Sequence, residues 1–176
     1  MSSRLLLVSG SLRARSTNTA VLRTAALLVP AGVEAVLYEG LATLPAFNPD
    51  NEVLLPPEVV NLRSEIHAAA AVIFSTPEYA GALPGSFKNL LDWTIGDDQP
   101  GSIYNKPVAW INASTRGAGG AHRELREVLG YAHASIVETA AVAVPITEAM
   151  IGADGLVADA EARLAIAHSI AAIVAT

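Results

Sequence analysis

Short apolar runs and helical apolar spacing alternate along this chain. Apolar-rich runs are typical of strands that are covered on both faces, and they occupy residues 5–8, 33–38, 71–75, 107–112 and 136–144. Apolar residues at helical spacing predict helices over residues 17–29, 56–69, 85–95, 125–132 and 157–174. Strands and helices that alternate in this way indicate an α/β fold, in which helices cover both faces of a parallel sheet.

No feature of the sequence marks a domain boundary. A chain of 176 residues is of ordinary size for one domain. No repeat, linker or low-complexity tract interrupts the alternation of strands and helices. We therefore expect a single domain over residues 1–176. Residues 40–51 hold two prolines and no usable period, and they are expected to form a long loop.

Charge and cysteine content exclude several classes of function. The net charge is −6 and the pI about 5.1, and the sequence offers no basic stripe for a phosphate backbone, so nucleic acid is not an expected partner. The absence of cysteine excludes disulfides, thiolate nucleophiles and cysteine metal sites. The longest apolar run, residues 68–74, is too short to span a membrane. We expect a cytoplasmic protein without a membrane partner.

The apolar content predicts association between subunits. Hydrophobic residues make up 52% of the chain and charged residues only 16%, which leaves little charged material to cover the outside. Apolar helix surface is then expected to be buried between copies of the chain, as in a homodimer or homotetramer.

Ligands of an open parallel sheet bind beyond the carboxyl ends of its strands, and the first polar segment that follows a predicted strand is residues 9–18. It offers the side chains of Ser11, Ser16, Thr17 and Asn18 and the cation of Arg13 or Arg15. Together with the free N–H groups of a helix start, these donors suit a terminal phosphate group. The alternative is an N-cap followed by solvated loop residues.

The second segment, residues 76–85, follows the third predicted strand. Its two prolines and two glycines force an irregular backbone, whose N–H and C=O groups are free to contact the edge of a flat heterocycle. In the alternative interpretation, Glu78 caps a helix and Tyr79 packs against the protein.

The third segment, residues 114–120, follows the fourth predicted strand. Its clustered glycines predict a concave nest of backbone amides that would stabilise negative charge on a ligand. A dinucleotide-binding fingerprint is the rival interpretation, with Gly117, Gly119 and the acidic Glu138. His122 stands where that fingerprint needs its third glycine.

These segments together carry a family resemblance. The sequences GSLRARSTN, TPEYAGALPGSFKNLLDW and Ser-x-x-Gly-x-Gly-Gly, in this order, resemble the NADPH-dependent FMN reductase family, which includes flavin-dependent quinone, chromate and azo-dye reductases. The loop over residues 44–50 and the dipeptide Lys106-Pro107 also match, so the resemblance covers nearly the whole chain. It departs at Ala80, where many members carry Asn.

The resemblance implies a flavodoxin-like, doubly wound, five-stranded parallel sheet of order 2-1-3-4-5 with one FMN at the strand ends. The first segment would hold the FMN phosphate, the second would line the isoalloxazine mostly through its backbone, and the third would close over the other edge of the ring. The expected cofactor-binding residues are Ser11, Arg13, Ser16, Thr17, Asn18, Pro77, Glu78, Tyr79, Ala80, Gly81, Ser114, Thr115, Gly117, Gly119 and Gly120.

The function that the resemblance implies is that of an FMN-dependent NAD(P)H oxidoreductase. Hydride from NADPH or NADH would pass through the flavin to small acceptors such as quinones, free flavin or other electrophiles. No catalytic side chain is expected, because the flavin N5 carries the chemistry. No metal is expected, because the four histidines are scattered. The alternative is a non-enzymatic flavin-binding protein or a single-electron carrier of the flavodoxin type.

Overall fold

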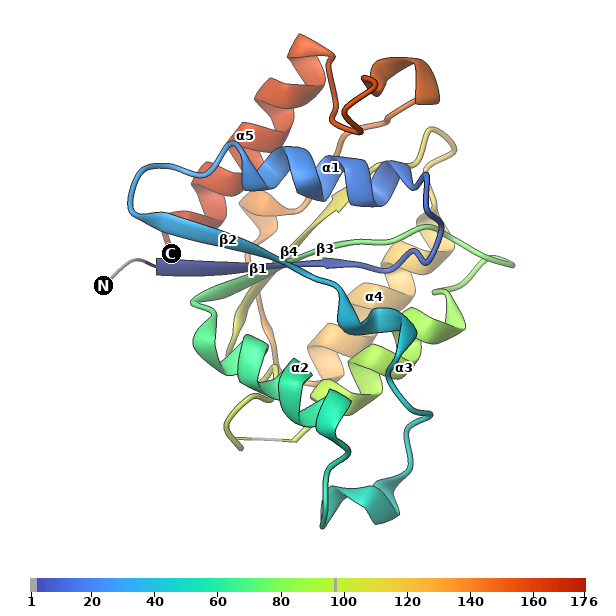
Figure 1. Ribbon diagram of the computed structural model, residues 1–176, viewed down its shortest axis with the longest axis vertical. Helices are drawn as coiled ribbons and strands as arrows, with labels where there is room; N and C mark the ends of the chain where they lie inside the picture. The colour runs from blue at the N-terminus through green and yellow to red at the C-terminus, as the bar shows by residue number, and fades with distance from the viewer. Residues whose placement is uncertain (1–2, 97) are drawn as a thin grey trace.

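The computed structural model describes residues 3–96 and 98–176, which form an α/β fold around one parallel sheet (Figure 1). The strand order is β2-β1-β3-β4-β5, which confirms the predicted flavodoxin-like topology. The strands are β1 Ser3–Ser9, β2 Val33–Tyr38, β3 Ala71–Ser75, β4 Pro107–Asn112, β5 Ser135–Ile136 and β6 Val142–Ala143. The helices are α1 Thr17–Ala26, α2 Pro57–Ala68, α3 Gly85–Thr94, α4 Gly119–Tyr131 and α5 Ala160–Val174.

The sheet separates two hydrophobic cores. Successive strand residues point to opposite faces, so Leu6 and Val8 of β1 join the core beneath α2, α3 and α4, whereas Leu5 and Leu7 join the core beneath α1 and α5. The same alternation continues in β3 and β4. Burial on both faces explains why these strands read as continuous apolar runs.

The fifth predicted strand, residues 136–144, is wrong as a single element. The structure divides it into β5 and β6, which pair with successive parts of β4, and places a 3₁₀ turn, Glu138–Ala140, between them. The turn buries Ala140 completely, and the Ala140 carbonyl accepts a hydrogen bond of 2.6 Å from Ser169 of α5. Packing against α5 therefore interrupts the strand.

Other features also differ from prediction, and the largest difference is that the fourth helix, expected over residues 125–132, begins at Gly119. The first helix ends at Ala26 and not at residue 29, since Pro30 disfavours a helical residue before it. The last helix begins at Ala160 and not at 157, because the Asp159 side chain accepts from the Ala162 N–H as an N-cap. The loop over residues 40–51 contains 3₁₀ turns at Gly40–Ala42 and Pro49–Glu52.

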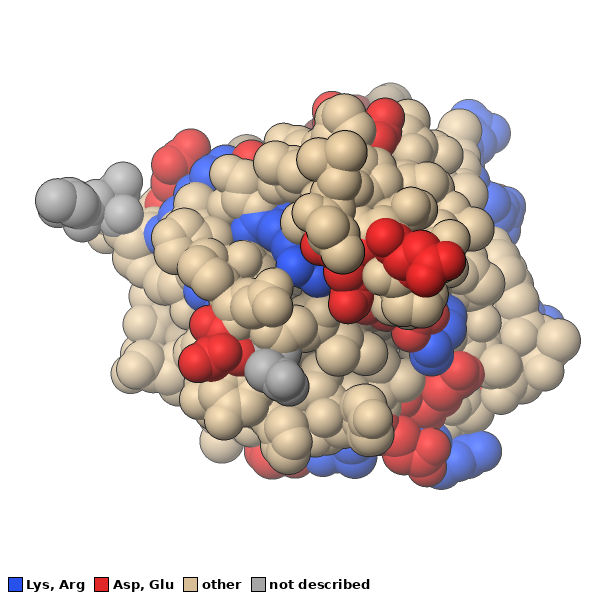
Figure 2. Space-filling view, turned by 90° about the horizontal axis from the view of Figure 1, so that it is seen from below, with Lys and Arg blue, Asp and Glu red and all other residues tan. Residues whose placement is uncertain are grey.

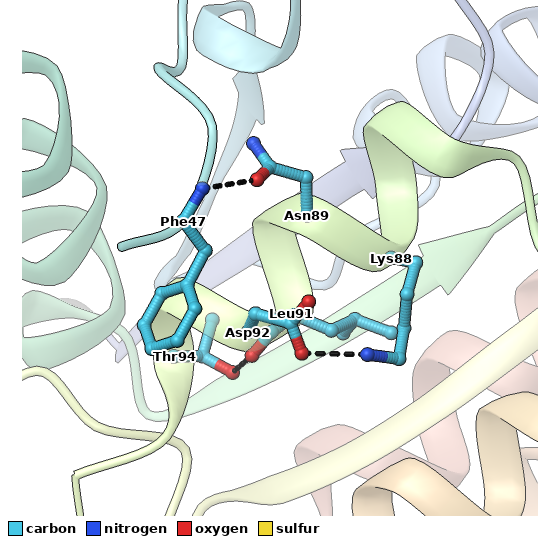
Figure 3. A network of polar contacts seen from close by, with 6 residues as sticks. All are labelled: Phe47, Lys88, Asn89, Leu91, Asp92 and Thr94. Atoms are coloured by element: carbon cyan, nitrogen blue, oxygen red, sulfur yellow. Dashed lines mark hydrogen bonds and ion pairs between the residues drawn. The ribbon is translucent and has the colours of Figure 1, made fainter. Parts of the chain in front are cut away.

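Helix α3 holds the loop over residues 44–50 in place (Figure 3). The Asn89 carboxamide accepts a hydrogen bond of 2.7 Å from the Phe47 N–H and donates one of 2.9 Å to the Pro45 carbonyl. The Trp93 indole N–H donates to the same carbonyl at 2.9 Å, and its ring meets the Phe47 ring edge-on. The loop motif thus serves to anchor this connection on α3.

The surface carries few charges relative to its area. In Figure 2, Lys and Arg side chains lie among Asp and Glu on one face, and most of that face belongs to other residues. Within the described part of the chain, no helix is long and apolar enough to cross a membrane.

Candidate functional site

The carboxyl ends of β1, β3 and β4 are bonded to one another and to α1. The Gly10 N–H donates to the Ser75 carbonyl at 2.8 Å, and the Ser75 hydroxyl lies 2.9 Å from Asn18 Oδ1 and 2.7 Å from the Ile111 carbonyl. Gly10 is required at this junction, because a Cβ there would lie 2.5 Å from Thr76 Oγ1 and 2.9 Å from the Phe87 ring. The floor of the site is therefore rigid.

A cavity of about 720 Å³ opens above this floor, a volume within the usual range for small-molecule sites. Its lining comes from the three segments singled out in the sequence and from residues 146–148, which follow β6. The structure thus brings together segments that are up to about 130 residues apart in sequence at the edge of the sheet where open α/β sheets bind ligands.

Most of the residues expected to bind the cofactor line this cavity. They are Ser11, Arg13, Ser16, Thr17, Asn18, Pro77, Glu78, Tyr79, Ala80, Ser114 and Thr115. The lining does not include four of the glycines: Gly81, Gly117, Gly119 and Gly120. These four shape the backbone behind the cavity wall.

Sequence reasoning missed part of the lining. Ala113, Arg116, Ala118, Ile146, Thr147 and Glu148 belong to it, as does Arg15, which the sequence suggested only as a substitute for Arg13. Residues 146–148 could have been found by applying the strand-end rule to the last strand as well.

The first segment, residues 11–18, combines capping with unpaired donors. Ser16 is the N-cap of α1, and its hydroxyl accepts from the Thr19 N–H at 3.3 Å, so the N-cap interpretation is confirmed for this residue. Arg13 and Arg15 are exposed, and neither forms an ion pair with another residue of the described chain. Their guanidinium groups remain available to a ligand.

The second segment, residues 76–85, is fastened to α4 by two carboxylates. Glu78 Oε2 accepts hydrogen bonds from the N–H groups of Gly120, at 2.7 Å, and Ala121, at 3.0 Å. Glu124 Oε2 accepts from the Leu83 N–H at 2.7 Å. Carboxylates stabilise a helix N-terminus, so the interpretation of Glu78 as a cap is confirmed and its side chain is already engaged.

The same segment turns sharply at the mouth of the cavity. Tyr79 and Ala82 pair through backbone hydrogen bonds of 3.0 and 3.1 Å, with Ala80 at φ 52° and Gly81 at φ 78° between them. Such a turn needs positive φ at both central residues, which is unfavourable for alanine. The Tyr79 side chain is 49% exposed, so it does not pack in the core.

The third segment, residues 114–120, is organised by Asn112 at the end of β4. The Asn112 carboxamide donates to the Gly117 carbonyl at 2.7 Å and accepts from the Ser114 N–H at 3.0 Å. Ser114 in turn accepts from the Arg116 N–H at 3.1 Å. Asn112 is a buried residue that sequence reasoning missed, and it fixes the loop without lining the cavity.

Gly120 is required where the second and third segments meet. A Cβ at this position would lie 2.0 Å from the Gly81 carbonyl oxygen and 3.0 Å from Glu78 Oε2. A Cβ added at Gly119 would meet only Arg123 Nη1, at 3.4 Å. Close approach of the two loops therefore depends on Gly120 and not on its neighbour.

The cavity is more basic than the protein as a whole. Arg13, Arg15 and Arg116 line it, against the carboxylates of Glu78 and Glu148, and Glu78 is occupied as the cap of α4. In a chain of net charge −6, this concentration of cations favours an anionic ligand.

His122, in the first turn of α4, stands beside the cavity and does not line it. Its Nδ1 lies 2.9 Å from the Ala118 carbonyl. Burial lowers the pKa of the imidazole, although the Ala118 carbonyl and the nearby Glu78 act in the opposite direction. The ring packs near Trp110, which fits a structural role.

These observations define a class of protein: a flavodoxin-like α/β domain with an arginine-rich cavity at the strand ends. The structure superimposes on the flavoenzyme NAD(P)H:(acceptor) oxidoreductase FerB of Paracoccus denitrificans with a TM-score of 0.84 and 27% identity, over 98% of this chain and 96% of that one. A flavodoxin of Pseudomonas aeruginosa, with a TM-score of 0.59 and 21% identity over 97% of this chain and 98% of that one, shares the fold.

The sequence comparisons identify the family. The model of the NADPH-dependent FMN reductase family matches residues 3–149. An NAD(P)H-dependent FMN reductase of Pseudomonas aeruginosa is 34% identical over 97% of this chain and 92% of its own length. A quinone reductase of Escherichia coli is 35% identical over 78% of this chain and 76% of its own length. The chain belongs to the NADPH-dependent FMN reductase family.

Proposed function

We propose that this protein is an FMN-dependent NAD(P)H oxidoreductase that reduces small acceptors of the quinone type. The observation that carries the proposal is the cavity at the strand ends, where three arginines without ion pairs in the described chain stand beside hydroxyls and irregular backbone. Family membership and the activities for which the two relatives are named support the same conclusion.

The residues present fit FMN. Ser11, Thr17 and Arg13 offer hydroxyl and guanidinium donors for a phosphate at the α1 end of the cavity, and charge-assisted bonds of this kind are strong. Residues 77–80 and 113–115 offer a partly apolar wall for the ring system. FMN, when bound, supplies the capacity to store two electrons between a nicotinamide donor and an acceptor.

The protein itself binds the flavin and orients its substrates. Glu78 is held as the cap of α4, and His122, whose pKa is lowered by burial, lies outside the cavity lining. Because donor and acceptor must both reach the same ring system within this cavity, we expect them to bind in turn.

Reduction by nicotinamide nucleotides tests this proposal. FMN-loaded protein should lose its flavin absorbance when NADPH or NADH is added without oxygen, and regain it when a quinone follows. Initial rates with both substrates varied should give parallel lines, the pattern of a two-step exchange through a shared pocket. A protein that binds FMN but is not reduced by either nucleotide would instead be a carrier or a non-enzymatic flavin-binding protein.

We also propose that the protein works as a homodimer or homotetramer of single-domain chains. Large apolar side chains are exposed at Val53, Leu54, Tyr131 and Leu164, with 96%, 85%, 77% and 69% of their surface accessible. Contiguous exposed apolar surface commonly marks an interface, and Val53 and Leu54 are adjacent in the chain. Light scattering at micromolar concentration should give a mass of two or four chains, and a monomer would contradict the proposal.

A further inference from the structure

A second groove adjoins the cavity at its α1 end. It has a volume of about 310 Å³ and lies between α1 and the turn over residues 151–155. Arg15, Ser16 and Glu148 line both hollows, so the two are neighbours at the end where the phosphate of FMN is proposed to bind. No residue of segments 77–81 or 113–118 lines the groove. The groove therefore joins the cavity at the phosphate end and not at the ring end.

Two cations define the chemistry of the groove. Arg15, Thr19 and Arg23 follow one another at intervals of four residues along its α1 wall. The Arg23 guanidinium reaches across to the opposite turn, where a Cβ on Gly155 would lie 3.8 Å from its Nη1. Like Arg15, Arg23 has no ion pair with any other residue in the described ranges. The Thr19 hydroxyl is already bonded to Ser9 at 2.9 Å, so the two guanidiniums are the groups suited to a phosphate.

The remaining walls suit a nucleoside. Ala20, Ile151 and Ala153 provide apolar surface, and Glu148 presents an exposed carboxylate at the boundary between the two hollows. Carboxylates commonly accept hydrogen bonds from ribose hydroxyls in dinucleotide sites. The turn that forms the far wall is itself ordered, with the Gly152 N–H bonded to the Leu156 carbonyl at 2.9 Å.

We propose that this groove is a subsite for a second phosphate and its adenosine, the adenosine-phosphate half of a dinucleotide. The inference rests on the proposed function, because it places the first phosphate in the main cavity. Two dinucleotides carry this chemistry. In FAD the second phosphate is bonded directly to the flavin phosphate, and in the nicotinamide nucleotides it belongs to the electron donor.

Flavin titrations of two variants test the subsite. Arg23→Gln removes the cation that lines only the groove, and Arg126→Gln, on the exposed face of α4, is a control with the same change of charge. Loss of one charge-assisted hydrogen bond should weaken FAD binding to Arg23→Gln by about tenfold or more. The affinity for FMN should stay unchanged, and Arg126→Gln should bind both flavins as the wild type does.

Steady-state kinetics of the FMN-loaded proteins distinguish the two sources. If the subsite serves the electron donor, Arg23→Gln should raise the KM for NADPH or NADH several-fold and leave kcat and FMN affinity unchanged. The proposal is overturned if Arg23→Gln changes neither FAD affinity nor that KM, or if it weakens FMN as much as FAD. Failure of the wild type to bind FMN would overturn the proposed function, and the subsite with it.

Discussion

The two ends of the cavity are built in opposite ways. The entry segment of α1, residues 11–18, presents arginines and hydroxyls that have few partners inside the protein. The paired loops, residues 77–83 and 112–124, use their side chains within the protein: Glu78 and Glu124 accept from N–H groups of the facing segment, and Asn112 bonds to its own loop. One end is thus free to bind charge, whereas the other is fixed in shape.

This difference assigns different tasks to the two ends. Unpaired guanidiniums contribute affinity when a phosphate arrives. A backbone that is already bonded costs little to order when a ring docks against it. Substitutions in the entry segment should therefore change ligand affinity and spare stability, and substitutions in the paired loops should lower stability first.

The largest expected effect is a loss of stability at the contact between the paired loops. Gly120→Ala would place a Cβ 2.0 Å from the Gly81 carbonyl oxygen, so the loops must separate and Glu78 must release its amides. Overpacking of this kind costs about 3 kcal/mol, measured as the free energy of unfolding in urea without flavin. Gly119→Ala is the matched control. Its Cβ meets only the Arg123 side chain, and it should leave stability unchanged or slightly higher.

Substitutions in the entry segment should change the affinity for FMN and leave the stability of the protein unchanged. Arg13→Ala removes an exposed guanidinium that lines the cavity, and we expect FMN to bind about 1.5–3 kcal/mol more weakly, the usual value of a hydrogen bond to a charged group. Fluorescence titration measures the affinity, and the urea midpoint of the flavin-free protein should not move. If the affinity for FMN is unchanged, Arg13 does not bind the phosphate, and Arg15 becomes the candidate.

A smaller loss of stability is expected at Glu78. Glu78→Ala leaves the N–H groups of Gly120 and Ala121 without their acceptor, which should cost about 1–2 kcal/mol, as for other helix caps. Glu78→Gln keeps an acceptor oxygen and should cost less. If the alanine variant unfolds like the wild type but loses flavin affinity, Glu78 acts on the ligand and the division between the two ends fails.

The smallest expected effect is a gain of stability at the turn that contains Ala80. Ala80 adopts φ 52°, a conformation that is strained for a residue with a Cβ by about 1–2 kcal/mol. Ala80→Gly should therefore stabilise the protein by about 1 kcal/mol, after allowance for the greater freedom of glycine in the unfolded chain. The same substitution at Ala82, outside the positive-φ pair, should give no such gain in a thermal melt.

The family resemblance was sufficient to predict the sheet order, and the sequence pattern predicted three of the four segments that line the cavity. Buried parallel strands leave continuous apolar runs, and strand ends in such a sheet meet at one edge. The division of residues 136–144 was not predictable from the run itself, because it depends on Ser169 of α5, 29 residues away from Ala140. The hydrophobic pattern of a segment does not show where packing against a distant helix will interrupt a strand.

The use of Glu78 shows a second limit. Its partner amides are 42 and 43 residues further along the chain, so the pattern could suggest a cap but not the helix that it serves. For the same reason the glycines of residues 117–120 suggested direct contact with a ligand, although none of Gly117, Gly119 and Gly120 lines the cavity. From the sequence alone, a glycine needed for contact between two loops cannot be distinguished from one needed for contact with a ligand.

The most direct test of the division between the two ends compares FMN with riboflavin, which lacks only the phosphate. Both are titrated into flavin-free wild-type protein under identical salt, because the phosphate contribution is electrostatic. If the entry segment binds phosphate and the paired loops only shape the ring site, FMN should bind at least about 10-fold more tightly than riboflavin, as charged hydrogen bonds predict. Equal affinities for the two flavins would contradict the assignment of the phosphate to residues 11–18.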